Sequence, residues 1–285
     1  NESSGHAEGL AVHSPALSFR ALGLQVFTTC QQSNQSSPEA YTGAVVEIAR
    51  WSDEVGCEGI LVYTDNGLVD PWMVAQLVIE STQTLCPLVA VQPVYMHPYT
   101  AAKKVASFAY LYNRRIWLNM VAGGFRLDLK ALADETPHDE RYDRLVEYSL
   151  IIKGVLASSK PFSFAGDYYT VQNLRMTPAL PPELFPGITV SGSSPAGLRA
   201  AHRRLEATAV KYPRRAQEEA EDTSSGSAQL GMRCGVIARE TDEEAWDVAL
   251  ERFPEDRQGQ LTHALAMQVS DSHWHRQLSE LGRDE

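Results

Sequence analysis

The chain has 285 residues, of which 44% are hydrophobic and 21% are charged, and its formal net charge at pH 7 is −11. A chain of this length can bury its apolar residues in one large core, and no apolar run approaches the roughly 20 residues that cross a bilayer. The acidic balance argues against nucleic acid as a partner, because proteins that bind phosphate backbones present a basic face. We therefore expect residues 1–285 to form a single domain that binds neither a membrane nor nucleic acid.

The N-terminal segment and the cysteines indicate where the protein resides. The opening residues NESSGHAEGL lack the basic start and the apolar core of a signal peptide, and we expect residues 1–18 to be a flexible segment. Cys30, Cys57, Cys86 and Cys234 are far apart and show no metal-ligand spacing. Because free thiols are typical of reducing compartments, we predict reduced cysteines and a cytoplasmic protein.

Short apolar runs alternate with helical patterns along the chain, which predicts repeated strand–helix units and a parallel sheet. The runs have about six residues, too few for a core helix, and they are rich in Val, Ile and Leu, as strands buried on both faces require. The predicted strands are residues 22–29, 59–64, 88–93, 115–121, 187–192, 207–212 and 234–239. No eighth run of this kind is evident, so we expect a C-terminal strand and helix to be missing from the chain.

The predicted helices carry start signals in the sequence. Ser37 is an N-cap candidate followed by Pro38 at the first helical position, and Thr136 with Asp139 forms an aspartate variant of a capping box. The predicted helices are residues 38–55, 71–84, 101–112, 137–156, 195–205 and 242–252.

One segment departs from the strand–helix alternation. Residues 162–171, FSFAGDYYTV, alternate in polarity on both sides of Gly166 and Asp167, which predicts a β-hairpin inserted into the barrel pattern. Its Tyr168 and Tyr169 are interpreted as surface structure.

Polar residues and glycines follow the predicted strands, where parallel sheets place their ligand sites. Gln92 and His97 flank the end of the third strand, in a loop that Pro93 and Pro98 make rigid. Gln92 suits a bond to a bound ring or to a substrate carbonyl, but it suits loop ordering equally well. A lone His97 is more often a satisfied loop histidine than a catalyst.

A second group follows the fourth strand. Asn119 either hydrogen-bonds the edge of a bound ring or caps the next turn, while Gly123 and the glycine after it would let a flat ring approach the backbone. His138 and Tyr142 lie four residues apart near a helix start and so share one face. Two charged residues of the same helix, Arg141 and Glu147, are interpreted as members of structural ion pairs.

Residues 191–195, SGSSP, join the fifth predicted strand to a helix. Gly192 permits a tight turn, and the hydroxyls of Ser193 and Ser194 lie at the positive end of the helix dipole together with free backbone N–H groups. This set suits a dianionic phosphate, but a plain Ser-Pro N-cap explains the same residues. The residues alone leave both interpretations open.

Several segments together resemble the bacterial luciferase-like superfamily of flavin-dependent monooxygenases, on its alkanesulfonate monooxygenase-like branch. They are LVAVQP (88–93), LNMVAGG (118–124), HDERYDRLVEY (138–148), FAGDYYTV (164–171), ELFPGITVSGSSPAG (183–197) and CGVIARETDEEAW (234–246). The resemblance covers most of residues 59–246 and implies an α/β fold, the (β/α)8 TIM barrel of the luciferase-like type. It also implies a two-component system in which a partner flavin reductase supplies FMNH2. Reaction of FMNH2 with O2 would give a C4a-peroxyflavin that oxygenates a small organic metabolite, and we expect a homodimer or homotetramer.

The resemblance also implies roles for individual residues. Arg233, at the predicted start of the last strand, and His97 are the catalytic candidates, and no metal is expected. Relatives on the sulfonate branch have a histidine where this chain has Gly235 and a cysteine near the position of Leu68, and these departures argue against an alkanesulfonate substrate. The implied cofactor-binding residues are Gln92, Asn119, Gly123, His138, Tyr142, Ser191, Gly192, Ser193 and Ser194, of which the last four would hold the FMN phosphate.

Two alternatives stay open beside the FMNH2-dependent monooxygenase. A deazaflavin-dependent oxidoreductase on the same barrel would need cationic groups for a long anionic tail, which an acidic chain with a compact Ser-Ser turn disfavours. A non-catalytic flavin-binding relative is favoured by the missing histidine and cysteine. The sequence does not distinguish hydroxylation, N-oxidation and Baeyer–Villiger insertion, because loops of unknown shape line a barrel pocket.

Overall fold

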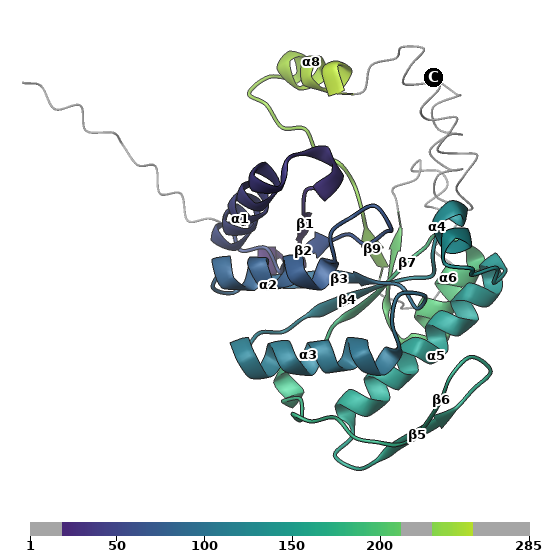
Figure 1. Ribbon diagram of the computed structural model, residues 1–285. Helices are drawn as coiled ribbons and strands as arrows, with labels where there is room; N and C mark the ends of the chain where they lie inside the picture. Colours follow the sequence, from purple (N-terminus) through teal and green to yellow (C-terminus); the bar gives the residue numbers. More distant parts are fainter. Residues whose placement is uncertain (1–18, 212–229, 253–285) are drawn as a thin grey trace, which may run out of the picture.

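The computed structural model describes residues 19–211 and 230–252, and its centre is a curled sheet of parallel strands (Figure 1). Within the described residues this sheet has seven strands in the order β1-β2-β3-β4-β7-β8-β9. The strands are β1 (Phe27–Thr29), β2 (Gly59–Val62), β3 (Cys86–Val91), β4 (Trp117–Val121), β7 (Ile188–Ser191), β8 (Thr208–Lys211) and β9 (Leu230–Met232). The open, curled sheet confirms the predicted α/β barrel class, with the eighth strand not evident among these residues.

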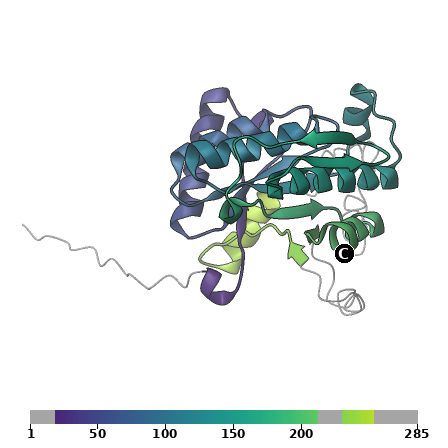
Figure 2. The same cartoon turned by 90° about the horizontal axis from the view of Figure 1, so that it is seen from below.

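Long helices cover the outer face of the sheet, as Figures 1 and 2 show from two directions. They are α1 (Pro38–Glu54), α2 (Pro71–Ser81), α3 (Pro98–Tyr112) and α5 (His138–Ala157). The first three begin with a proline after a capping side chain, since Ser37, Asp70 and His97 each accept a hydrogen bond from a backbone N–H of the first turn.

Helix α5 begins differently from the prediction. The expected capping box is wrong, because the Thr136 hydroxyl donates to Asp134 Oδ1 at 2.6 Å instead of capping the helix, and Pro137 takes the cap position. Asp134 is held in turn by Arg144, whose Nη2 lies 2.6 Å from Asp134 Oδ2. This cluster fixes the loop that leads into α5.

The remaining helices are shorter. The predicted helix 195–205 forms α6 (Pro195–Arg199) and continues as the π-helix η4 (Ala200–Leu205), and α8 (Asp242–Arg252) forms as predicted. Helix α4 (Arg126–Ala131) was not predicted. Short 3-10 helices complete the set: η1 (Phe19–Leu22), η2 (Ser33–Gln35) and η3 (Pro182–Leu184).

The inserted hairpin is confirmed as β5 (Phe162–Ala165) paired antiparallel with β6 (Thr170–Leu174). Glu147 is buried on α5, and its carboxylate accepts hydrogen bonds from the backbone N–H groups of Asp167, Tyr168 and Tyr169 at 2.8, 2.9 and 3.1 Å. The predicted ion pair of Glu147 is therefore replaced by a cap on the hairpin turn. Tyr168 and Tyr169 are both partly exposed, as expected for a surface hairpin, but the Tyr169 ring also packs against Tyr148 of the core, at 5.8 Å between ring centroids.

The last strand lies earlier than predicted. Strand β9 is Leu230–Met232, and it pairs with β8, after which the Arg233 N–H donates to the Lys211 carbonyl at 2.8 Å. Residues 234–239, predicted as this strand, have no regular structure. The predicted flexible segment 1–18 lies outside the described residues.

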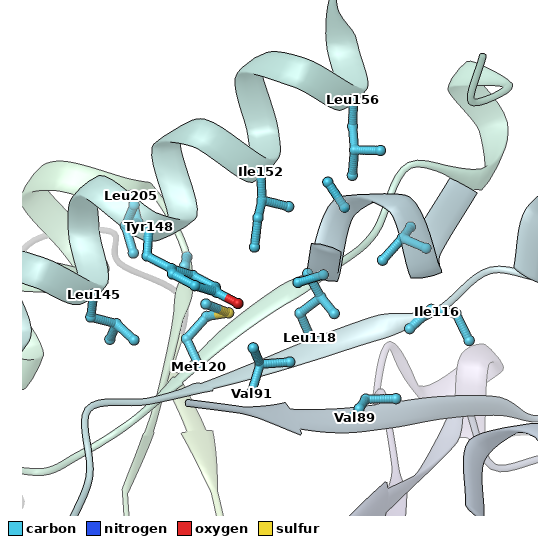
Figure 3. Packing of buried hydrophobic residues seen from close by; sticks show 14 of the residues in the cluster. Val89, Val91, Ile116, Leu118, Met120, Leu145, Tyr148, Ile152, Leu156 and Leu205 are labelled. Carbon is cyan, nitrogen blue, oxygen red and sulfur yellow. The ribbon is translucent and has the colours of Figure 1, made fainter. Parts of the chain in front are cut away.

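Side chains of the strands alternate between two cores. The outward-facing Val91, Leu118 and Met120 pack with Tyr148 and Ile152 of α5 in the main hydrophobic cluster (Figure 3). The inward-facing Leu61, Cys86, Leu88 and Trp117 form a separate cluster inside the curl of the sheet. This inner cluster fills the part of the curl that lies away from the carboxyl ends of the strands. Open space is therefore left toward those carboxyl ends.

Candidate active site

A cavity of about 400 Å³ lies at the carboxyl ends of the parallel strands. It is bounded by residues that end β2, β3, β4, β7 and β8, by the loops that follow them, and by the start of α5. All predicted cofactor residues line it, as does Arg233: Gln92, Asn119, Gly123, His138, Tyr142, Ser191, Gly192, Ser193 and Ser194. Within the described residues, no group of three His, Cys, Asp or Glu side chains is placed to hold a metal ion.

The wall formed by β4 and β7 is polar. Asn119 and Thr189 face each other across the two strands, and the Thr189 hydroxyl donates to Asn119 Oδ1 at 2.9 Å. The Asn119 Nδ2 group donates to the Ser191 hydroxyl at 3.5 Å. The strand register therefore fixes the orientation of a buried amide at the cavity wall, as a ring-binding residue requires.

The loop after β4 exposes its backbone to the cavity. Gly123 has a φ of +102°, and a Cβ at this position would lie 3.0 Å from Gln92 Oε1. Arg141, which is 2% exposed, donates from Nη1 to the Gly123 carbonyl at 3.1 Å. A glycine is needed here for both conformation and space, and the buried guanidinium holds its peptide in place.

The loop after β7 meets Tyr142 of α5. Gly192 has a φ of +153°, and a Cβ here would lie 2.3 Å from the Tyr142 hydroxyl oxygen. Ser193 and Ser194 are buried, and Ser194 Oγ accepts from the Gly197 N–H at 3.2 Å at the start of α6. Burial raises the pKa of Tyr142 above its ordinary value, and a hydrogen bond with Ser194 offsets this only in part. The phenol therefore stays protonated at neutral pH and can donate a hydrogen bond.

His138 stands beside this group at the first position of α5. Its ring meets the Tyr142 ring edge-on, with 5.4 Å between centroids, and its Nδ1 lies 2.8 Å from Asp139 Oδ1. The predicted shared face of these two residues is therefore present, and both side chains reach the cavity.

The opposite wall comes from the end of β2 and from the segment after β9. Arg233 Nη2 donates to the Tyr63 hydroxyl, and the guanidinium carbon lies 5.0 Å from the centre of the Tyr63 ring. This contact joins strands near opposite edges of the sheet, so it closes the cavity across the opening of the curl. Arg233 follows the last strand instead of beginning it, which corrects the prediction.

His97 is separate from the cavity. Its Nδ1 accepts a hydrogen bond from the Tyr99 N–H at 3.2 Å as the cap of α3, and its exposed ring packs against Tyr169 at 6.0 Å between centroids. The structure therefore gives His97 a local structural function and does not bring it together with the other candidates.

Sequence reasoning missed the β2 side of the cavity. Tyr63, Thr64 and Asp65 line it directly after β2, and Gln32 and Phe125 line it from neighbouring loops. The signal was present, because a tyrosine, a threonine and an aspartate end an apolar run in the same way as the residues identified after the third and fourth strands.

These observations describe a curled parallel sheet with a cavity at the carboxyl ends of its strands, and the chain belongs to the luciferase-like monooxygenase family, whose model matches residues 23–284. It is 38% identical over 242 residues to the 4-(γ-L-glutamylamino)butanoyl-[BtrI acyl-carrier protein] monooxygenase BtrO of Niallia circulans, covering 83% of this chain and 70% of that protein. This likeness supports an oxidoreductase of the monooxygenase class.

Solved structures show the same fold. The monooxygenase RslO1 from Streptomyces bottropensis superimposes with a TM-score of 0.69 at 18% identity, covering 86% of this chain and 80% of that one. The oxygenating constituent of 3,6-diketocamphane monooxygenase from Pseudomonas putida, a type II Baeyer–Villiger enzyme in complex with FMN, has a TM-score of 0.65 at 15% identity, covering 85% and 76%. Within the described residues, no helix is both long and apolar enough to cross a membrane.

Proposed function

We propose that this protein is the oxygenating component of a two-component monooxygenase, which binds reduced FMN supplied by a partner reductase and uses O2 to oxygenate a small organic substrate. One observation carries the proposal: a cluster of hydroxyl and N–H donors and a backbone surface open to a flat ring lie in the same cavity. Membership in the luciferase-like family and the FMN bound by the 3,6-diketocamphane relative support the choice of cofactor.

The residues of the β7 loop fit a phosphate group. Buried Ser193 and Ser194, the neutral phenol of Tyr142 and the N–H groups before α6 are all able to donate hydrogen bonds to an anion. Gly192 leaves open the position that a Cβ would otherwise fill against Tyr142. We assign the phosphate of FMN to this loop.

The residues of the β3 and β4 ends fit a flat, polar ring. The orientation of Asn119 is fixed by Thr189, and Gln92 lies beside the Gly123 peptide that Arg141 holds. When bound, the reduced flavin supplies the electrons that activate O2. The protein's own contribution is to hold the ring, exclude water and orient the substrate, which explains why the cavity needs few acid–base groups.

The remaining wall, with Tyr63 and Arg233, is left for the substrate. We propose Arg233 as a substrate contact, because its guanidinium lines the cavity beyond the assigned flavin residues. BtrO acts on an acyl group held by a carrier protein, so acyl substrates, free and carrier-bound, are the first class to test.

The assignment of the phosphate loop is tested by substituting Gly192 with alanine. The added Cβ would lie 2.3 Å from the Tyr142 hydroxyl and displace it, so we expect FMN affinity to fall by roughly tenfold or more. Gly43→Ala in α1 is the matched control, because a Cβ there meets nothing within 4 Å. Quenching of tryptophan fluorescence by reduced FMN, followed without O2, gives the FMN affinity of the wild type and of each variant. Equal FMN binding by Gly192→Ala and the wild type would contradict the assignment.

A turnover measurement tests the activity. The protein is mixed with FMN, NADH, a flavin reductase and candidate acyl substrates under 18O2, and the products are analysed by mass. Incorporation of one labelled oxygen supports the monooxygenase. Binding of FMN without any product from a broad substrate set would favour a non-catalytic flavin-binding protein.

A further inference from the structure

The charged side chains of the cavity follow β2 and β9, whereas the assigned flavin residues belong to other strands and to α5. Among the residues that the structure describes, the Asp, Glu, Lys and Arg side chains that line the cavity are Asp65 and Arg233. Arg233 lies over the ring of Tyr63, and Asp65 comes two residues after Tyr63 in the loop that follows β2. An acidic and a basic side chain thus line the same cavity.

Asp65 is presented by a well-fixed loop. Its Oδ1 accepts a hydrogen bond from the Gly67 N–H at 2.7 Å. The intervening Asn66 donates from its backbone N–H to Asp128 Oδ2 at 3.3 Å and from Nδ2 to the Asp128 carbonyl at 3.1 Å, and it accepts from the Tyr95 hydroxyl at 2.8 Å. The loops after β2 and β3 and the helix α4 are therefore tied together beside Asp65.

The carboxylate of Asp65 has no cationic partner within the part of the chain that the structure describes. Its bond to Gly67 needs only a side-chain oxygen, and asparagine would supply that oxygen without a charge. A partly buried carboxylate loses hydration, and this loss is compensated when an opposite charge binds. The turn therefore does not require the charge at Asp65.

We propose that Asp65 binds an ammonium group of the substrate, and that the substrate is zwitterionic, with its anionic end at Arg233. The proposal rests on the proposed function in taking this cavity as the active site. An amine and a carboxylate joined by a short aliphatic chain carry the charges opposite to those of the two side chains that line the cavity.

The test compares three ligands of equal chain length, 5-aminopentanoate, pentanoate and pentylamine, by calorimetry on the full chain. We expect 5-aminopentanoate to bind roughly tenfold to a hundredfold more tightly than either singly charged ligand, as hydrogen bonds to charged groups allow. Equal affinity for pentanoate and 5-aminopentanoate, or binding of none of the three, would overturn the proposal.

The substitution Asp65→Asn isolates the charge, because it keeps the oxygen that accepts from Gly67. We expect it to abolish the preference for 5-aminopentanoate over pentanoate. Asp128→Asn is the matched control, since it removes an equal charge from the same group of loops at a residue that does not line the cavity. A preference for 5-aminopentanoate that survives in Asp65→Asn would contradict the proposal. If this variant does not fold, the affinities of the wild type for the three ligands decide the question.

FMN affinity, measured on the same proteins, separates this proposal from the proposed function. We expect Asp65→Asn to bind FMN like the wild type, because the assigned flavin residues lie on other strands. If the wild type bound no FMN in either redox state, the flavin proposal would fall, while the ligand series would still decide the role of Asp65.

Discussion

Replacing Tyr148 with phenylalanine is expected to stabilise the protein. Tyr148 is fully buried on α5, and its ring packs on Met120 and Val91 in the main core (Figure 3). Its hydroxyl has no hydrogen-bond partner within the described residues, and burial raises its pKa far above the usual range. The hydroxyl is therefore a buried donor that loses its water on folding without a replacement.

The size of the effect follows from two opposing terms. An unsatisfied buried polar group costs about 1–3 kcal/mol, and removing one oxygen leaves a small void that takes back part of the gain. We expect Tyr148→Phe to raise the free energy of unfolding by about 0.5–2 kcal/mol, which corresponds to a few degrees in Tm for a chain of this size.

Urea denaturation followed by circular dichroism measures this difference, with the slope of the transition compared between proteins. Tyr95→Phe is the matched control, and we expect it to lower the free energy of unfolding. The Tyr95 hydroxyl donates to Asn66 Oδ1 at 2.8 Å, and loss of this hydrogen bond should destabilise the protein by about 1 kcal/mol. A destabilised Tyr148→Phe variant would refute the reasoning, since it would show that the Tyr148 hydroxyl is satisfied in the folded protein.

Two further predictions concern titratable groups. Burial raises the pKa of Asp134, but hydrogen bonds from Arg144 and Thr136 outweigh it and lower the pKa from 3.8 to about 2. A lowered pKa means that Asp134 stabilises the fold fully above its unfolded pKa near 3.8 and loses this contribution as the pH falls toward 2. Asp134→Asn should therefore be less stable than the wild type at pH 7 but nearly equal to it near pH 2, as urea titrations at both values would show; an equal deficit at both would contradict this. Cys234 is exposed, whereas Cys30, Cys57 and Cys86 are buried free thiols, and burial raises the pKa of Cys30 to about 11. A thiol reagent should therefore modify Cys234 rapidly and the three buried cysteines only when the protein unfolds. Rapid modification of Cys30, identified by peptide mass, would contradict the buried placement.

The sequence predicted the site most successfully where strand ends carry polar residues. Ser191 ends the fifth predicted strand, whereas Asn119 lies within β4, two residues before its end. Because parallel strands place their carboxyl ends together, both residues were expected in one site. Tyr63 and Asp65 satisfy the same rule after β2 but were not identified from the sequence. Their place became evident only when Arg233, 170 residues along the chain, was found against Tyr63.

Local competition explains the other differences. The sequence did not show whether His97 is a catalytic residue or a helix cap. Its neighbour Pro98 signals a helix start, but it does not show that the imidazole itself accepts the capping hydrogen bond. Thr136 has a nearer partner in Asp134 than the helix N–H groups, so the capping box did not form. Strand β9 has only three residues, one of which is Gly231, so its sequence gives a weak strand signal. Residues 234–239 have the stronger pattern, but in the structure it is β9 that pairs with β8 and these residues have no regular structure.

We propose that the cavity binds reduced FMN for reaction with O2, and an anaerobic titration of the protein with FMN is the decisive test. The protein is titrated with reduced and with oxidised FMN while the fluorescence of its tryptophans is followed. We predict saturable quenching by reduced FMN and much weaker binding of oxidised FMN, as expected for a flavin that is reduced elsewhere and delivered to the site. Absence of binding by both forms would contradict the account and every cofactor residue assigned to the cavity.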